Sequence, residues 1–158
     1  DDPRVIRMRT FSKAYGMAGA RVGYAIGHPE LIASFNKVRN HFGMNRAAQA
    51  GALAALQDQA YLSETVARIS DARDQITKIS RKNGLTAIPS ATNFVTIDCG
   101  QDAAFAQRVL AALINEGLFV RMPFVAPQNQ CIRISCGTSD NLALLGAALP
   151  KALKNAAE

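Results

Sequence analysis

The stretch FSKAYGMAGARVGYAIG, Phe11–Gly27, places one lysine in front of a glycine-bearing turn and one arginine behind it. Three functions compete for this arrangement: a glycine-rich nucleotide loop, a basic contact to nucleic acid, and a reactive amine beside an anion clamp. A nucleotide P-loop carries its lysine after the glycines, whereas Lys13 precedes Gly16 and Gly19. The GMAG segment also supplies only half of a dinucleotide fingerprint. The sequence therefore disfavours both nucleotide loops.

The third function accounts for the neighbours of Lys13. The segment Val5–Thr10 alternates apolar and basic residues with the period of a strand, so Lys13 is predicted just beyond a strand end. Thr10 and Ser12 offer hydroxyls there, and Arg21 offers a bidentate fork to a phosphate. Because positive neighbours favour the neutral form of an amine, this lysine suits attack on a carbonyl. A phosphate clamp beside an aldehyde-reactive lysine predicts pyridoxal 5'-phosphate as the cofactor.

Composition limits the class of protein. With 158 residues, 49% hydrophobic and 19% charged, the chain suits a folded domain with a real core. No apolar run approaches the ~18 residues of a membrane span, and no signal peptide opens the chain. The absence of an initial methionine leads us to expect a fragment of a longer protein. Three cysteines without CxxC spacing predict buried thiols rather than a metal site or disulfides, and hence a cytoplasmic setting.

Positive charge is concentrated near the start of the chain. Residues 1–48 carry eight Lys or Arg against three Asp or Glu, and residues 49–158 carry ten against nine. Such a balance suits an anionic partner. The charges are nevertheless scattered among apolar residues, with no basic run or basic helix face, so nucleic acid is not the expected partner.

Hydrophobic periodicity predicts alternating strands and helices, and therefore an α/β fold. The predicted strands are Val5–Thr10, Arg21–Ile26, Thr92–Cys99, Leu118–Met122 and Cys131–Ser135. The predicted helices are Pro29–Asn40, Arg46–Leu56, Ala60–Lys82, Asp102–Glu116 and Asn141–Ala157. Two strands with little helix would leave an apolar face uncovered, so the first segment is too thin for a whole domain.

The motif SKAYGMAGARVGY resembles the lysine motif of the class I/II aminotransferases, enzymes of fold type I that depend on pyridoxal phosphate. It is most similar to the histidinol-phosphate aminotransferase group, and seven positions match in order: Thr10, Ser12, Lys13, Tyr15, Gly19, Arg21 and Gly23. PSATNFVTID, EGLFVR and CIRISCGT are similar to later segments of the same family. The resemblance thus runs from Val5 to the end of the chain.

The resemblance implies the C-terminal half of a fold-type I enzyme. Residues 1–58 would end the large cofactor-binding domain, and residues 59–158 would form a small α/β domain. It also implies a cytoplasmic homodimer, with HFGMN, residues 41–45, similar to a family segment near the dimer interface. The substrates implied are a small amino acid or amino-phosphate and a 2-oxo acid, with no metal, nucleic acid or membrane.

Roles for individual residues also follow from the resemblance. Lys13 would form the internal aldimine with the cofactor and later move a proton between the substrate Cα and the cofactor. Thr10, Ser12 and Arg21 would hold the cofactor phosphate. Arg133 would pair with the substrate carboxylate, and Arg121 would meet a second anionic group or a substrate phosphate. Tyr15 is expected to pack, and the two histidines, His28 and His41, to be structural or solvent-facing.

Other interpretations stay open on sequence alone. Arg21 and Arg133 could be structural arginines in ion pairs, and Arg121 an ordinary exposed strand end. Within the family, Lys13 and Arg133 suit a decarboxylase or lyase equally well. A non-catalytic module with a basic face is a further alternative. Because the family's remaining cofactor contacts lie upstream, the chain alone is expected to be inactive.

Overall fold

The computed structural model describes residues 2–158, which form two compact units with the boundary between Val66 and Ala67. The boundary falls inside the longest helix, α3 (Gln59–Lys82). The assignment of residues 1–58 and 59–158 to a large and a small domain stays a prediction. Among residues 2–158, no helix combines the length and apolar character needed to cross a membrane.

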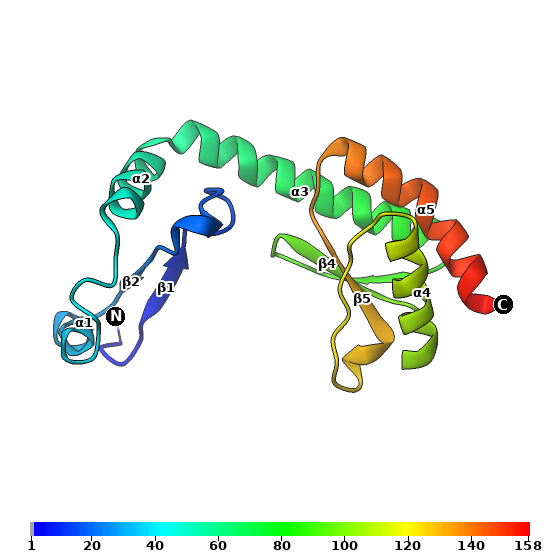
Figure 1. Cartoon of the computed structure of the whole chain (residues 1–158), viewed down its shortest axis with the longest axis horizontal. Helices are drawn as coiled ribbons and strands as arrows, with labels where there is room; N and C mark the ends of the chain where they lie inside the picture. Colours follow the sequence, from blue (N-terminus) through cyan, green and yellow to red (C-terminus); the bar gives the residue numbers. More distant parts are fainter. Residues whose placement is uncertain (1) are drawn as a thin grey trace. The chain divides into compact units, whose positions relative to one another are not determined.

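The first unit is built on an antiparallel ribbon of β1 (Arg7–Thr10) and β2 (Gly23–Ile26) (Figure 1). The register runs from Arg7 opposite Ile26 to Thr10 opposite Gly23. A 3₁₀ turn, Ala18–Ala20, lies between the strands, and α1 (Pro29–Ala33), a second 3₁₀ turn (Ser34–Lys37) and α2 (Arg46–Gln57) follow them.

The core of this unit is small. Phe11 and Val22, at the loop end of the ribbon, pack with Ala48 and Ala52 of α2. Every residue of β1 is exposed, and Met8 retains 73% of its accessible surface. The expected uncovered apolar face is therefore present.

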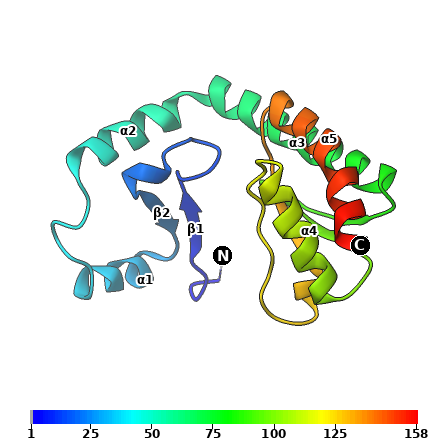
Figure 2. The same cartoon turned by 45° about the vertical axis from the view of Figure 1, so that its right-hand side comes forward.

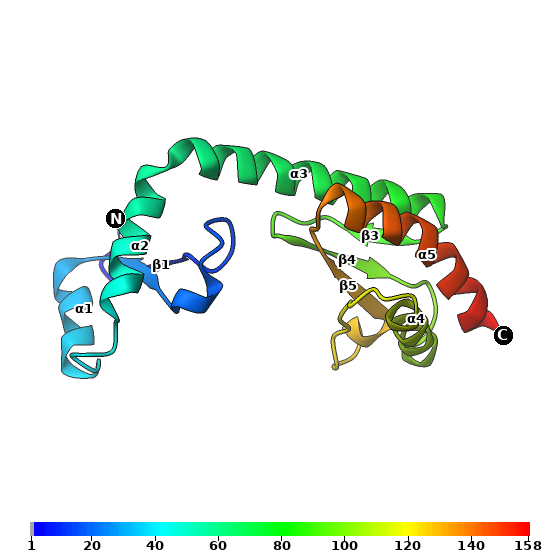
Figure 3. The same cartoon turned by 45° about the horizontal axis from the view of Figure 1, so that its top comes forward.

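The second unit contains an antiparallel sheet with the order β3 (Thr86–Ile88), β4 (Phe94–Asp98), β5 (Cys131–Ser135) (Figure 3). Figures 1 and 2 show α4 (Ala103–Asn115) and α5 (Ser139–Ala157) side by side. The core joins these helices and α3 to one face of the sheet, and that face carries Val95, Ile97, Ile132 and Ile134.

Alternation along the strands assigns the remaining side chains to the opposite face of this sheet. That second face carries Phe94, Thr96 and Asp98 from β4, and Arg133 and Ser135 from β5. Polar and aromatic residues thus alternate with the apolar residues that bind the helices. The face without helices is the one available to a ligand.

Most of the predicted helices are confirmed with small shifts at their ends. The helix α4 buries Phe105, Val109 and Leu113, and Gly117 follows it with a positive φ of 83°. Gly84 has a φ of 75° just beyond α3, a conformation typical of the glycine that ends a helix. Within α3, Ala72 and Ile76 are buried, whereas Val66 is exposed.

Three predicted elements need correction. The helix expected over Pro29–Asn40 ends at Ala33 and continues only as the 3₁₀ turn. The strand expected from Arg21 begins at Gly23, because Arg21 adopts a left-handed conformation that no strand accommodates.

The third correction concerns the predicted strand Leu118–Met122. Only Arg121 is paired there, through a single bridge to Arg133. Pro123 follows immediately and has no N–H to extend the pairing. The short strand β3, in turn, was not predicted, since three residues carry too little periodicity to be recognised.

Candidate active site

The loop that carries Lys13 is anchored by Phe11, which retains 2% of its accessible surface. The Phe11 N–H donates to the Val22 carbonyl at 3.3 Å, and the Met17 N–H donates to the Phe11 carbonyl at 2.9 Å. The Phe11 ring also lies 4.9 Å from the Tyr15 ring, between centroids, which confirms Tyr15 as a packing residue. The loop is therefore held from both sides by backbone hydrogen bonds and an aromatic anchor.

Lys13 itself begins a tight turn. The Gly16 N–H donates to the Lys13 carbonyl at 2.8 Å, and Gly16 has a positive φ of 69°, which favours glycine. The Lys13 side chain is exposed, and its amine has no hydrogen bond or ion pair among residues 2–158. A fixed backbone thus presents a free amine.

The ribbon register brings the predicted phosphate ligands to the same end as Lys13. Thr10 pairs with Gly23, and the next residues, Phe11 and Val22, are joined by the hydrogen bond described above. One step further along this register, Arg21 corresponds to Ser12. The Ser12 N–H donates to Thr10 Oγ1 at 3.0 Å, which holds the two hydroxyl residues in a local turn.

Arg21 has an unusual backbone conformation. Its φ of 53° and ψ of 49° lie in the left-handed region, and it is the only non-glycine residue with positive φ among residues 2–158. That conformation costs roughly 1–2 kcal/mol in a residue with a β-carbon. Arg21 Nη1 donates to the Ala18 carbonyl at 2.7 Å, which fixes the side chain over its own loop. One guanidinium donor is used, and the other N–H groups stay available to a ligand.

The electrostatic setting of this loop favours an anion. Residues 3–29 include four arginines and Lys13 but no Asp or Glu. Of these arginines, Arg4 is paired with Asp2 at 2.7 Å. Lys13 and Arg21 form no ion pair within residues 2–158. Two hydroxyls, one guanidinium and one amine without an acidic partner are a donor set suited to phosphate.

In the second unit, Arg121 and Arg133 are direct cross-strand neighbours. The Arg121 N–H donates to the Arg133 carbonyl at 3.1 Å, and the Arg133 N–H donates to the Arg121 carbonyl at 2.6 Å. Residues opposed in this way direct their side chains to the same face. Two like charges directly opposite destabilise a sheet. An anion bound by both guanidinium groups would relieve this repulsion.

No carboxylate of the described chain, residues 2–158, supplies that anion by an ion pair with either arginine. Each guanidinium lies instead over an aromatic ring: Arg133 at 4.7 Å from the centroid of Phe94, and Arg121 at 5.8 Å from that of Phe119. Neither Arg133 nor Arg21 therefore has, within residues 2–158, the ion-pair partner that a structural arginine would need.

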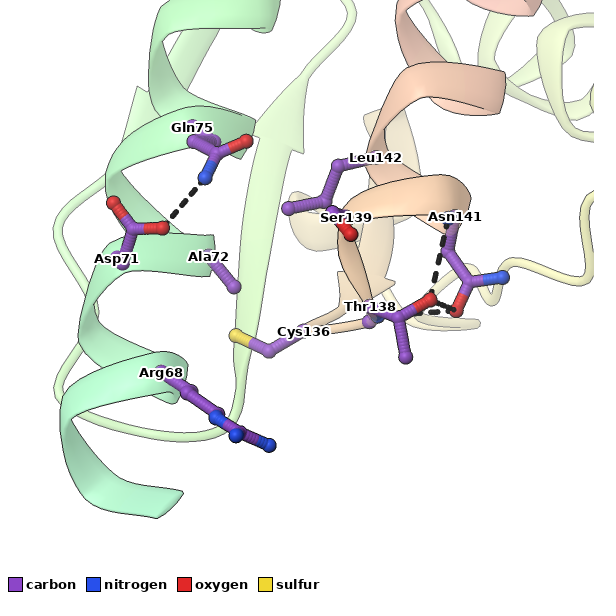
Figure 4. A pocket seen from close by; sticks show the side chains of 10 residues that line it. Arg68, Asp71, Ala72, Gln75, Cys136, Thr138, Ser139, Asn141 and Leu142 are labelled. Carbon is purple, nitrogen blue, oxygen red and sulfur yellow. Dashed lines mark hydrogen bonds between the residues drawn. The ribbon is translucent and has the colours of Figure 1, made fainter. Parts of the chain in front are cut away.

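A polar cavity of about 620 Å³ lies elsewhere in the second unit, between α3 and the start of α5 (Figure 4). Most of its polar side chains already have partners: Gln75 Nε2 donates to Asp71 Oδ2 at 2.6 Å, and Thr138 and Asn141 form the capping box of α5. The Cys136 thiol donates to the Ile69 carbonyl at 3.7 Å. None of the predicted site residues lines this cavity, and its hydrogen bonds stabilise helix structure.

The structure thus brings the predicted residues together in two groups. Thr10, Ser12, Lys13 and Arg21 share one loop region of the first unit. Arg121 and Arg133 are paired in the second unit. Their roles toward a cofactor phosphate and anionic substrate groups stay predictions.

Comparison with known proteins bears on the resemblance found in the sequence. The family model of aminotransferase class I and II matches residues 1–149. The chain belongs to the class I and II aminotransferase family. It is 41% identical over 154 residues to histidinol-phosphate aminotransferase 2 of Ralstonia nicotianae, which covers 98% of this chain and 41% of that protein. It is 50% identical over 139 residues to the histidinol-phosphate aminotransferase of a Geobacter species, covering 87% of this chain and 39% of the relative.

Solved aminotransferase structures share the fold. The histidinol-phosphate aminotransferase of Sinorhizobium meliloti, in complex with pyridoxal-5'-phosphate, is 51% identical with a TM-score of 0.93 over 98% of this chain and 42% of that one. A mutant aspartate aminotransferase of Thermus thermophilus is 25% identical with a TM-score of 0.78, covering 96% of this chain and 44% of its own. The predicted α/β fold class, that of the fold-type I enzymes, is confirmed. The chain spans about two fifths of the length of the relatives that it matches.

Sequence reasoning missed the aromatic partners of the two arginines. Phe94 lies two positions before Thr96, the residue opposite Arg133, and this diagonal relation depends on the register of β4 and β5. No local signal in the sequence reports that register. His28 and His41 are exposed, in keeping with the expected solvent-facing positions. Asn45 accepts the Ala48 N–H at 2.7 Å and caps α2.

Proposed function

We propose that the whole protein is a pyridoxal-phosphate-dependent aminotransferase of the histidinol-phosphate type, which transfers an amino group between an amino donor and a 2-oxo acid. This chain contributes the reactive lysine, part of the phosphate clamp and the arginines for the substrate. The observation that carries the proposal is the Arg121–Arg133 pair, two opposed cations without an ion-pair partner among residues 2–158. The names of the relatives support the same substrate class.

The residues of the Lys13 loop fit the cofactor. Pyridoxal phosphate needs an amine for its aldehyde and donors for its phosphate, and the loop offers a free amine, two hydroxyls and a guanidinium. Thr10, Ser12 and Arg21 would hold the phosphate, and Lys13 would hold the aldehyde carbon.

When bound, pyridoxal phosphate supplies an aldehyde that condenses with amines and an electron sink for charge that develops at the substrate Cα. Lys13 Nζ would hold the cofactor through its aldehyde carbon, and the same amine, once free, would accept the proton from the substrate Cα and give it up again as a general acid. The hydrogen bond from the Gly16 N–H to the Lys13 carbonyl fixes the backbone that carries this amine.

The arginines orient the substrate in this proposal. Arg133 accepts the substrate carboxylate in a bidentate pair, because a guanidinium matches the geometry of two carboxylate oxygens. Arg121, directly opposite, binds a second anionic group such as a phosphate. Binding of both groups relieves the repulsion between the two guanidiniums, so a doubly anionic substrate gains more than a neutral one.

We also propose a cytoplasmic homodimer. The segment similar to the family's dimer-interface region, residues 41–45, carries Phe42, which retains 95% of its accessible surface, and Val38 just before the segment retains 82%. Exposed aromatic and branched side chains of this kind are typical of interfaces. The three cysteines are free thiols, as a reducing compartment favours. Light scattering on the full-length protein tests the dimer.

The test of the cofactor assignment is reductive trapping. The chain is incubated with pyridoxal phosphate, reduced with borohydride, and the labelled lysine is located by mass spectrometry. We expect label on Lys13, with loss of that label in Lys13→Ala and retention in Lys37→Ala, a change at another exposed lysine of the first unit. Label that avoids Lys13 refutes the assignment.

The test of the reaction uses the full-length protein. Amino transfer from histidinol phosphate to 2-oxoglutarate is compared with release of CO₂ or ammonia from the same donor. Transfer as the main reaction supports the proposal, whereas CO₂ or ammonia without transfer favours the decarboxylase or lyase alternative.

A further inference from the structure

We propose that Phe94 is a positioning residue that orients the Arg133 guanidinium for the substrate carboxylate. The inference deepens the proposed function and rests on the carboxylate role of Arg133. Its starting point is the ring of Phe94, whose centroid lies 4.7 Å from the Arg133 guanidinium carbon. A guanidinium over an aromatic face at this distance is attracted by the ring quadrupole.

The register of the sheet explains how the two side chains meet. Arg133 is opposite Thr96, and Phe94 is opposite Ser135, so Phe94 and Arg133 are diagonal neighbours on one face. Long side chains bridge such a diagonal distance. The Arg133 N–H and carbonyl are both hydrogen-bonded to Arg121, and Arg133 lies opposite Thr96 of β4 on its other side, so its Cα is held between two neighbouring segments. The remaining freedom of Arg133 is in its side chain.

That freedom matters because Arg121 repels Arg133 from the opposite position. Residues 2–158 supply no carboxylate that forms an ion pair with Arg133 and opposes this repulsion. The Phe94 ring holds the Arg133 guanidinium in place. A neutral ring holds the cation without consuming its N–H donors, so the fork stays free for a carboxylate.

Phe94 is itself well anchored. Its carbonyl accepts the Ser90 hydroxyl at 2.6 Å, and its N–H donates to Thr92 Oγ1 at 3.3 Å. Arg73 of α3 in turn donates from Nη1 to the Thr92 carbonyl at 3.0 Å. The segment before β4 is thus tied to α3, and the ring belongs to a fixed element rather than to a free loop.

The experiment follows the Arg133 Nε–H signal of the ¹⁵N-labelled chain by NMR, assigned by its loss in Arg133→Lys. We expect a ring-current shift of this signal that disappears in Phe94→Leu. Phe124→Leu is the matched control, because the Phe124 ring retains 96% of its accessible surface and makes no ring contact within residues 2–158. Far-UV circular dichroism verifies that each variant is folded.

Titration with acetate then measures carboxylate binding at the same signal. We expect Phe94→Leu to raise the acetate dissociation constant by about 2- to 5-fold, the effect of one cation–π contact. Phe94→Tyr, which keeps the ring face, should retain the wild-type constant. An unshifted signal, an unchanged constant in Phe94→Leu, or equal losses in the Leu and Tyr variants each overturn the proposal. Reductive trapping at Lys13 is independent of Phe94, so it separates a failure here from a failure of the cofactor assignment.

Discussion

Two variants, Arg21→Gly and Arg21→Ala, distinguish the energetic effect of the Arg21 backbone conformation from the function of its guanidinium. Both variants lose the hydrogen bond from Nη1 to the Ala18 carbonyl. Only the alanine variant keeps a β-carbon at a φ of 53°. A β-carbon in that region costs roughly 1–2 kcal/mol, whereas glycine adopts it freely, at the expense of extra entropy in the unfolded chain. We therefore expect Arg21→Gly to be more stable than Arg21→Ala by about 1 kcal/mol.

The measurement is urea unfolding followed by tyrosine fluorescence. The chain has no tryptophan, and its three tyrosines, Tyr15, Tyr24 and Tyr61, all lie in the first unit. Tyrosine emission therefore reports on the unit that contains Arg21. With a urea dependence of about 1–3 kcal/mol per M, a difference of 1 kcal/mol separates the midpoints by about 0.3–1 M.

The same variants test the phosphate clamp. Since both lack the guanidinium, the pyridoxal phosphate concentration for half-maximal labelling of Lys13 should rise by at least about tenfold in each, the effect of losing a charged hydrogen bond. Equal stability of the two variants would refute the left-handed conformation. Unchanged labelling in both would refute the clamp, whatever their stabilities.

Three further predictions concern packing and the thiols. A β-carbon on Gly23 would lie 2.6 Å from a backbone carbonyl oxygen across the ribbon, so Gly23→Ala should destabilise the first unit by about 1–3 kcal/mol in the tyrosine assay, whereas Gly19→Ala should change stability little. Leu113 retains 0% of its accessible surface, so Leu113→Ala should lower the free energy of unfolding, followed by circular dichroism, by about 2–5 kcal/mol. A similar loss in Leu144→Ala, at a residue 43% exposed, would contradict this burial argument. Burial raises the pKa of the Cys99 thiol to about 11. The rate of its alkylation by iodoacetamide in the folded chain should therefore be low at pH 9 and rise toward pH 11. Fast alkylation at pH 8 would exclude a buried environment for this thiol.

The raised pKa of Cys99 also gives a sign for the pH dependence of stability. A thiol whose folded-state pKa is raised above its ordinary value of 9.0 stabilises the fold fully below that value. The contribution is lost as pH rises from about 9 to about 11, because the unfolded chain releases the proton first.

The sequence by itself determined the family motif of the lysine loop and the positions of the principal helices. The order of Lys13, the small residues and Arg21 is local, so it can be recognised without a fold. The long helices α2, α3, α4 and α5 carry enough apolar periodicity to be predicted within two residues at each end. The same local reasoning fails for β3 and for residues 118–122, where too few residues pair to leave a pattern.

Only the tertiary structure decided which residues surround the arginines. Arg121 and Arg133 become opposite neighbours through one bridge between distant segments, and Phe94 meets Arg133 through the register of β4 and β5. Period-two alternation specifies a strand's two faces but not its partner's register. The left-handed Arg21 is likewise a property of the closed loop, since the residue type alone favours ordinary conformations. Contacts that depend on pairing between distant segments therefore had to be read from the folded chain.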